Sequence, residues 1–308
     1  MISPGYRQSQ GDDTFFIKHS PNGKLTLLLV YIDDMIITGD NEIEKLNLKE
    51  KLATQFEMKE LGKLKYFLGI EVAYSKQGIF ISQRKYVLDL LKETRKLGCK
   101  IVGVPIEQNH RIGCEESPII EKSQYQILVG KLIYLSHTRP DIAYVVSVAV
   151  ERILQYLKAS LGKGLLFKKE ETLSMEIYTN ADYVGSVVDR RSTLGYCMFL
   201  GGNLKQNFEP WHKIILDDLK VKYEGPIKLF CDNNSTVSIA HNLVQHDKTK
   251  HIEIDRHFIK EKLDSGLIVT THVPIGLQVA DVFNKGLLAT RFQELNGMLG
   301  MIDIHLPT

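Results

Sequence analysis

The sequence contains few cysteines, little net charge and no long apolar run. Its 308 residues include only four cysteines, which are widely spaced and form no Cys-x-x-Cys pair. This pattern excludes the spacing of a zinc site and favours reduced thiols in an intracellular protein. The formal net charge of +2 is small, whereas dedicated nucleic-acid-binding proteins usually have a strong excess of basic residues. Local Lys/Arg patches can still bind nucleic acid.

Membrane and export signals are missing as well. No apolar run approaches the roughly 20 residues of a membrane helix, and the first residues show no charged-then-apolar signal pattern. We therefore expect an intracellular location, in cytoplasm or nucleus, and no contact with a membrane. The length favours two domains, and 44% hydrophobic with 25% charged residues is typical of a globular protein. Nothing in the sequence indicates an oligomeric state.

The most informative stretch runs from Leu27 to Thr38. Two apolar runs, typical of strands, flank a tight Ile32-Asp33-Asp34 segment where the chain must reverse. An unpaired buried carboxylate is very costly, so a hairpin tip that presents both acids to Mg2+ explains them well. The alternative is a surface β-turn, because Asp is a common turn residue.

This Tyr31-Ile32-Asp33-Asp34 hairpin resembles the catalytic motif of reverse transcriptases, and nearly the whole chain resembles a copia-type retrotransposon polyprotein. The resemblance implies that Asp33 and Asp34 are catalytic, Mg2+-binding carboxylates and that Tyr31 contacts nucleic acid. The fingers and the remaining metal-binding aspartate of the family lie upstream of this motif, and we expect them to be absent. Asp33 and Asp34 alone cannot complete a two-metal site.

Residues 1–160 therefore resemble a partial reverse-transcriptase palm and thumb. A helix is predicted over Asn41–Phe56, capped by Asn41 with Glu44 as its capping-box partner. Its expected buried face consists of Ile43, Leu46, Ala53 and Phe56. Alternating residues predict one strand over Lys65–Ala73.

Three residues of this part are candidate nucleic-acid contacts. Gly69 lies in a segment that resembles the primer-grip hairpin of the family, where a glycine lets a primer backbone approach closely. The alternative is a glycine at a strand bend. Arg84 and Lys85 begin a predicted helix and resemble phosphate-contacting thumb residues, while the alternative is a solvated helical face.

Two further helices are predicted before residue 160. They cover Tyr125–Ser136 and Thr138–Leu157, the second with Pro140 in its first turn. Both resemble connection segments of the family. The family has a short His- and Trp-containing stretch before Arg152, and because this chain lacks it, we expect the helical segments around it to be fused.

Residues 161–308 alternate strands with helices, which suggests an α/β domain. Strands are predicted at Leu165–Phe167, Met175–Thr179, Ser192–Leu200 and Ile227–Asp232. The pattern resembles a truncated ribonuclease H-like domain, so the whole chain is expected to be of the α+β or α/β class. A core strand and most of a helix are expected to be deleted after Gly202.

Ribonuclease H chemistry needs about four carboxylates that hold two Mg2+. By resemblance, the first position is Asn180, a neutral amide, with Asp182 two residues further on the same face of a strand. The second, a glutamate, has no counterpart. Asp232 and Asp281 match the third and fourth positions, although a helix N-cap and a solvated acid near a helix start are the respective alternatives. We expect weak Mg2+ binding at Asp232 and Asp281.

One further cluster could bind a metal. His251 and Asp255 are four residues apart, as are Glu253 and His257, and this spacing shares a helix face. By resemblance the segment lies beside the active site, where a histidine could assist product release. The alternative is a surface ion pair.

Three functions remain open from the sequence. The first is a retrotransposon-derived reverse transcriptase/ribonuclease H fragment, ancestrally an RNA-directed DNA polymerase and a nuclease of RNA–DNA hybrids, which is expected to be catalytically inactive. The second is a non-catalytic nucleic-acid-binding remnant, for which a salt-dependent affinity is expected. The third is a decayed reading frame without a selected role.

Overall fold

A computed structural model describes most of the protein. The described residues are 5–108, 122–147, 149–169, 173–182, 193–205, 218–220, 225–241 and 260–304. The chain forms two compact units, the first made of Met1–Lys65 with Phe208–Tyr223 and the second of Tyr66–Asn207 with Glu224–Thr308. This division follows contacts within the structure, and the predicted organisation into 1–160 and 161–308 stays a prediction.

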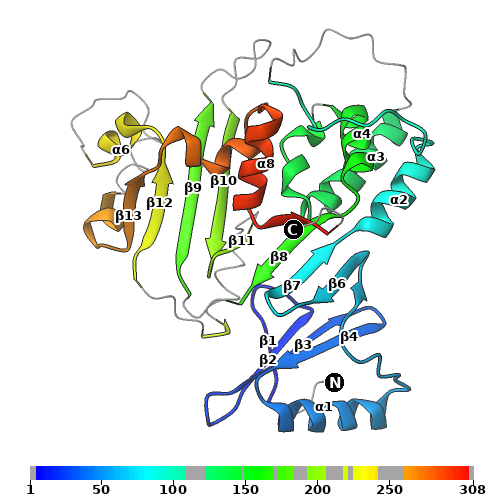
Figure 1. Ribbon diagram of the computed structural model, residues 1–308. Coiled ribbons are helices and arrows are strands. Elements are labelled where there is room, and N and C mark those ends of the chain that lie inside the picture. The colour runs from blue at the N-terminus through cyan, green and yellow to red at the C-terminus, as the bar shows by residue number, and fades with distance from the viewer. Residues whose placement is uncertain are drawn as a thin grey trace. The chain divides into compact units, whose positions relative to one another are not determined.

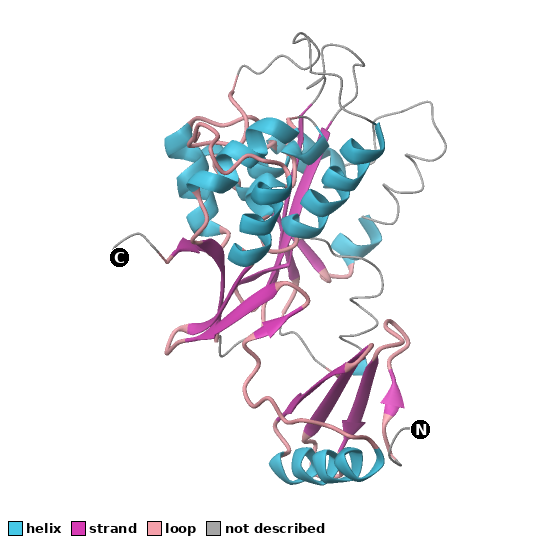
Figure 2. Ribbon diagram, turned by 90° about the vertical axis from the view of Figure 1, so that its right-hand side faces the viewer, coloured by secondary structure: helices cyan, strands magenta, loops and turns pink. Residues whose placement is uncertain are grey.

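Within residues 5–65, the first unit is an antiparallel sheet with helix α1. Strand order follows the sequence, and helix and sheet can be followed in Figure 2. Phe16 and Leu28 from the sheet and Leu48 and Leu52 from the helix form its core. The elements are β1 (Arg7–Gln8), β2 (Phe15–His19), β3 (Leu25–Tyr31), β4 (Asp34–Gly39) and α1 (Glu42–Gln55).

Helix α1 begins as predicted. The Asn41 side-chain oxygen accepts the backbone N–H of Glu44 at 3.2 Å, which satisfies one free donor of the first turn. The Glu44 carboxylate, however, accepts from Lys18 Nζ at 2.8 Å and from the Tyr6 hydroxyl at 3.3 Å. Glu44 therefore ties the helix to β2 instead of returning to the cap residue.

The predicted buried face of α1 is wrong. Ile43 and Leu46 are 74% and 59% exposed, and Phe56, which follows the helix, is also exposed. Leu48 and Leu52 are buried instead. Apolar residues occur on all sides of this helix, so periodicity could not select the face that the small sheet covers.

The second unit contains two five-stranded sheets. The first has the order β14-β8-β7-β6-β5. The second has the order β11-β10-β9-β12-β13, as Figure 1 shows. The strands are β5 (Tyr66–Phe67), β6 (Ile70–Tyr74), β7 (Gly78–Ser82), β8 (Lys163–Lys168), β9 (Met175–Asp182), β10 (Thr193–Leu200), β11 (Asn203–Lys205), β12 (Ile227–Cys231), β13 (Ile268–His272) and β14 (Met301–Asp303). Because β7 pairs with β8, the first of these sheets joins strands from both sides of residue 160.

Helices of the second unit enclose its main core. Leu91, Leu132, Leu135, Ile153 and Leu157 are fully buried in one cluster, and burial of such a side chain stabilises by about 1.5–3 kcal/mol. The α-helices are α2 (Arg84–Glu93), α3 (Lys122–Ser136), α4 (Val150–Ala159), α6 (Asn234–His241) and α8 (Ala289–Met298). The 3-10 turns are η1 (Pro140–Ile142), η2 (Val145–Ser147), η3 (Ile275–Leu277) and η4 (Val279–Phe283). No described helix combines the length and apolar character needed to cross a bilayer.

The prediction of one helix from Thr138 to Leu157 is wrong, because η1 and η2 precede α4. Tyr156 donates its hydroxyl to Asp141 Oδ2 at 2.5 Å. In one continuous helix these residues would lie about 22 Å apart along the axis. The break lets the chain fold back and close this contact.

One strand prediction also needs correction. Lys65–Ala73 is not one strand, because a turn at Leu68-Gly69 separates β5 from β6. After Gly202, residues Asn203–Lys205 form the short β11, which pairs with β10, and the expected deletion of a core strand and most of a helix stays a prediction. The mixed α/β architecture is confirmed.

Candidate active site

The Asp33-Asp34 segment forms a hairpin tip, as predicted. Tyr31 pairs with Asp34, so Ile32 and Asp33 are the two turn residues. All four residues are exposed. Ile32 has φ of +53°, a conformation that is a genuine outlier for a β-branched residue. Backbone strain of this kind costs about 1–3 kcal/mol and clusters at functional sites.

The strand register assigns the tip to one face of the sheet. Leu28, on the face of α1, alternates with Leu27 and Leu29 on the opposite face. Tyr31 and Asp34, as cross-strand partners, continue that opposite face. Among the described residues, no group of three or more acidic, His or Cys side chains gathers anywhere. The tip therefore offers two carboxylates.

Gly69 occupies a turn that requires its conformation. Leu68 and Gly69 have φ of +48° and +81° between the paired residues Phe67 and Ile70, as in the two-residue hairpin turns that favour glycine. The Leu68 carbonyl accepts the Tyr134 hydroxyl of α3. This finding accounts for the glycine by backbone geometry, while primer contact stays a prediction.

Arg84 and Lys85 lie at the start of α2 and are exposed. Lys85 Nζ is 5.8 Å from the centre of the Tyr66 ring, within the range of a cation–π contact. Tyr66 belongs to the strand that leads into the Leu68-Gly69 turn. Two cations and an exposed aromatic ring thus lie close to this turn.

In the second unit, two predicted positions come together. Asn180 on β9 donates its amide N–H to Asp281 Oδ1 of η4 at 2.5 Å, and both residues are buried. Lys285 Nζ forms an ion pair with the same oxygen at 2.9 Å. Sequence reasoning missed Lys285, although its i,i+4 spacing from Asp281 was a usable signal.

Close backbone approach makes this pairing possible. A Cβ at Gly195, the cross-strand partner of Asn180, would lie 2.6 Å from the Ala280 carbonyl oxygen. Only glycine therefore lets η4 pack against β10 at this point. Asn284 fixes the register further by donating its amide to the Asn180 carbonyl at 3.1 Å.

Asp232 follows the last residue of β12, which lies parallel to β9. Continuing the register from Phe230 and Tyr178 by two residues places Asp232 beside Asn180. The carboxyl ends of parallel strands are the usual site of ligand binding in such sheets. Asp182 is the last residue of β9. The predicted cluster from His251 to His257 lies outside the described residues.

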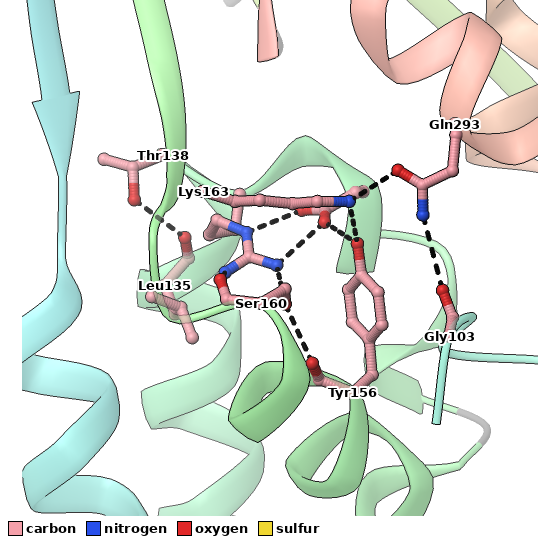
Figure 3. A network of polar contacts seen from close by, with 9 residues as sticks. Gly103, Leu135, Thr138, Tyr156, Ser160, Lys163 and Gln293 are labelled. Atoms are coloured by element: carbon pink, nitrogen blue, oxygen red, sulfur yellow. Dashed lines mark hydrogen bonds and ion pairs between the residues drawn. The ribbon is translucent and has the colours of Figure 1, made fainter. Parts of the chain in front are cut away.

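A buried polar network in the second unit was not predicted as a feature (Figure 3). Arg139 donates Nε and Nη2 to the two Asp141 oxygens, each at 2.9 Å, and Nη2 also donates to Ser160 Oγ at 2.8 Å. Lys163 Nζ donates to the Tyr156 hydroxyl at 3.1 Å and to Gln293 Oε1 at 2.8 Å. The network joins η1, α4, β8 and α8.

A second unpredicted feature lies in the first unit. Asp218, which is 5% exposed, accepts hydrogen bonds from Arg7, Ser9 and the Gln10 backbone. Burial on its own would raise the pKa of this carboxyl, but the hydrogen bonds from Ser9 and Gln10 and the charge of Arg7 lower it below its ordinary value. No local pattern in the sequence links positions more than 200 residues apart.

Comparison with known proteins agrees with this architecture. Residues 2–108 match the family model described as reverse transcriptase (RNA-dependent DNA polymerase). The chain is 30% identical, over 99% of its length, to the retrovirus-related Pol polyprotein from transposon RE2 of Arabidopsis thaliana, and 31% identical, also over 99%, to that from transposon RE1. It covers 24% and 23% of these proteins. An uncharacterized mitochondrial protein of Arabidopsis thaliana is 33% identical over 58% of this chain, which covers 80% of that protein.

These matches define a reverse-transcriptase-type protein. Residues 2–108 form a domain of the reverse transcriptase family, and nearly the whole chain is similar to a part of the Pol polyproteins of copia-type retrotransposons. It spans about a quarter of the length of the Pol polyproteins that it matches. Reverse transcriptases as a family use divalent metal ions and bind nucleic acid.

Proposed function

We propose that this chain is a catalytically inactive relic of a reverse transcriptase/ribonuclease H region that keeps an affinity for nucleic acid. The observation that carries the proposal is the Asn180–Asp281–Lys285 contact. An amide and an ammonium group both bond to Oδ1 of Asp281, one of the two carboxylate oxygens that could bind a metal ion. The neutral amide of Asn180 also stands at a position where the family has a carboxylate, so the site has one negative charge fewer than a complete ribonuclease H site.

The second sheet supports the ribonuclease H-like assignment of this part. Strand β9 has an antiparallel neighbour on one side, β10, and a parallel neighbour on the other, β12. Helix α6 follows β12 directly. A mixed five-stranded sheet with this arrangement is what a ribonuclease H-like domain has, and it brings positions 180, 232 and 281 to one end of the sheet.

These side chains do not fit a two-metal site. Two Mg2+ ions at a nuclease centre need carboxylates on both sides of the reacting phosphate. Here Asp281 is neutralised by Lys285, and Asn180 directs a donor toward it. Asp232 and Asp281 therefore retain weak Mg2+ binding at most.

The hairpin tip has a different chemistry. Asp33 and Asp34 are exposed acids with oxygen ligands that suit Mg2+, which commonly keeps several waters beside one or two carboxylates. In this proposal they hold the family's metal weakly, and Tyr31 lies beside them as a contact for nucleic acid.

Nucleic-acid affinity is assigned to the start of α2. Arg84 and Lys85 supply two exposed cations, and Tyr66 supplies an exposed ring on which a base can stack. Two phosphate contacts to a single strand give a slope of about −1.4 in log affinity against log salt. The Leu68-Gly69 turn lies next to this surface.

Catalytic inactivity is tested with a labelled RNA–DNA hybrid in Mg2+ and in Mn2+. We expect no cleavage by the wild-type chain, with folding verified by circular dichroism. Cleavage that disappears in both Asp232→Asn and Asp281→Asn would refute the inactive reading. A parallel titration calorimetry experiment is expected to show Mg2+ binding weaker than micromolar, and micromolar binding lost in Asp232→Asn would contradict the predicted weak site.

The binding surface is tested by fluorescence anisotropy with single-stranded DNA at several salt concentrations. We expect the double variant Arg84→Ala/Lys85→Ala to bind more weakly and to flatten the salt slope by about 1.4. The matched control, Lys76→Ala/Lys92→Ala, removes two exposed charges elsewhere in the same unit. An equal loss of DNA affinity in both double variants would indicate a non-specific effect of charge and would refute the assignment of the binding surface to the start of α2.

A further inference from the structure

The first unit contains an unusual contact between distant parts of the sequence. Arg7 Nη2 donates to Asp218 Oδ1 at 2.7 Å, and Ser9 Oγ and the Gln10 backbone N–H donate to Oδ2 at 2.8 and 3.0 Å. His19 Nε2–H donates to the Asp218 carbonyl oxygen at 2.9 Å. A charged guanidinium, a hydroxyl and a backbone amide thus converge on one anionic group.

These donors are held in place by the sheet. Arg7 pairs with Ile17 across β1 and β2, and His19 lies two residues beyond Ile17 on β2. The Ser9 hydroxyl also accepts the Gly11 N–H at 3.1 Å, and Ser9 is 3% exposed. The Ser9 hydroxyl is therefore held by a turn contact that does not involve Asp218, and the backbone of Arg7 is fixed by its pairing in the sheet.

The register places Arg7 and His19 on the face that carries the hairpin tip. Cross-strand partners share a face, so Arg7, Ile17 and Leu27 form one row. Leu27 and Tyr31 share that face, which lies opposite α1. From strand spacing, Arg7 lies about 17 Å from Tyr31. Ile17, which lies beside Arg7 in this row, is 1% exposed, so the row is covered there.

We propose that Arg7, Ser9 and the Gln10 N–H form an anion-binding site for a phosphate group, and that Asp218 occupies it in cis. A phosphate presents the same kind of acceptor oxygens as a carboxylate, with more charge, and charge-assisted bonds of this type are the strong ones. The donor set does not distinguish free inorganic phosphate from a phosphodiester of a nucleic acid. A nucleic-acid ligand rests on the proposed function, and the site itself does not.

This assignment gives Asp218 an inhibitory role. A phosphate that reaches Arg7 finds the donors already bonded to a carboxylate. Removal of the Asp218 carboxylate frees one phosphate contact. One additional contact steepens the salt slope by about 0.7 for a single strand.

The experiment compares the full-length wild-type chain with Asp218→Ala, Asp218→Ala/Arg7→Ala and the control Asp264→Ala, which removes an exposed acid of the second unit. Inorganic phosphate is expected to raise the melting temperature of Asp218→Ala alone. A labelled 12-nucleotide single-stranded DNA is expected to bind Asp218→Ala about tenfold more tightly than wild type, with the steeper salt slope. Asp218→Asn, which preserves the shape of the side chain, is the substitute if Asp218→Ala does not fold.

The outcomes separate the two sources of phosphate. If Asp218→Ala binds both inorganic phosphate and DNA more tightly than wild type, and Asp218→Ala/Arg7→Ala does not, the result supports the proposal for a nucleic-acid phosphate. A gain for inorganic phosphate alone supports the anion site and counts against nucleic acid as its ligand. The proposal is overturned if the rise in melting temperature with phosphate and the rise in DNA affinity equal those of Asp264→Ala. It is also overturned if neither Asp218 variant shows either rise.

Discussion

The buried network around Asp141 makes a quantitative prediction for the variant Asp141→Asn. The Asp141 side chain is fully buried and accepts two bonds from Arg139 and one from Tyr156. Asparagine keeps the shape of the side chain but removes the charge. One of its two oxygen positions also becomes an NH2 group, which faces donors.

The expected loss follows from the buried cation. With Asp141 neutral, the guanidinium of Arg139 remains buried without a counter-charge, and removal of one partner of a buried pair costs about 3–5 kcal/mol. Tyr156→Phe removes the bond to Asp141, worth about 1.5–3 kcal/mol, and the bond from Lys163, which keeps its bond to Gln293. It leaves no buried charge without a counter-charge. Asp141→Asn is therefore expected to destabilise the second unit more than Tyr156→Phe does.

The assay is urea unfolding with hydrogen exchange of the α4 amides, which separates the second unit from the first. The matched control is Glu151→Gln, which breaks the exposed pair with Lys96 and is expected to cost about 0–1 kcal/mol. A loss below about 1 kcal/mol for Asp141→Asn, equal to that control, would refute the reasoning.

Stability against pH tests the same carboxylate. Burial on its own would raise the pKa of Asp141, but the charge and hydrogen bonds of Arg139, with Lys163 and Tyr156, lower it below its ordinary value. A lowered pKa means that this contribution is present above the unfolded value of about 3.9 and is lost as the pH falls through the folded pKa. We expect this acid-side loss in wild type and its disappearance in Asp141→Asn.

Three smaller perturbations test local features by thermal unfolding. Ile32→Asn is expected to stabilise the first unit by about 1 kcal/mol, because asparagine tolerates positive φ, and a lower melting temperature would argue against strain at the hairpin. Asn41→Ala removes the cap of α1 and is expected to cost about 1 kcal/mol, whereas no change would show the cap to be dispensable. Gly195→Ala forces a methyl group against the Ala280 carbonyl and is expected to cost about 1–3 kcal/mol, while Gly98→Ala, with open space around it, serves as its control and equal effects would contradict the packing argument.

Local chemistry made part of the fold predictable. The Asp33-Asp34 hairpin and the Asn41 cap depend on residues that are neighbours in the sequence, and both were predicted correctly. The strand prediction over Lys65–Ala73 failed because alternation continues through the Leu68-Gly69 turn and conceals it. Turn geometry was the missing information there.

Long-range contacts were beyond local patterns. Position 281 was predicted as a site residue by resemblance, but its ion pair with Lys285 was not. The helix break after Arg139 depends on a contact between Asp141 and Tyr156 that only the folded chain makes. Asp218 shows the same limit, because its partners are chosen by the tertiary structure of the first unit.

The discontinuous first unit has a consequence for synthesis in the cell. Arg7, Ser9 and Gln10 leave the ribosome long before Asp218, since residues 66–207 are translated in between. At 5–20 residues per second this interval lasts roughly 7–28 s, far longer than the microseconds that a hairpin needs to form. Until Asp218 has been synthesised, the donors of Arg7, Ser9 and Gln10 on the nascent sheet are therefore accessible to cellular anions.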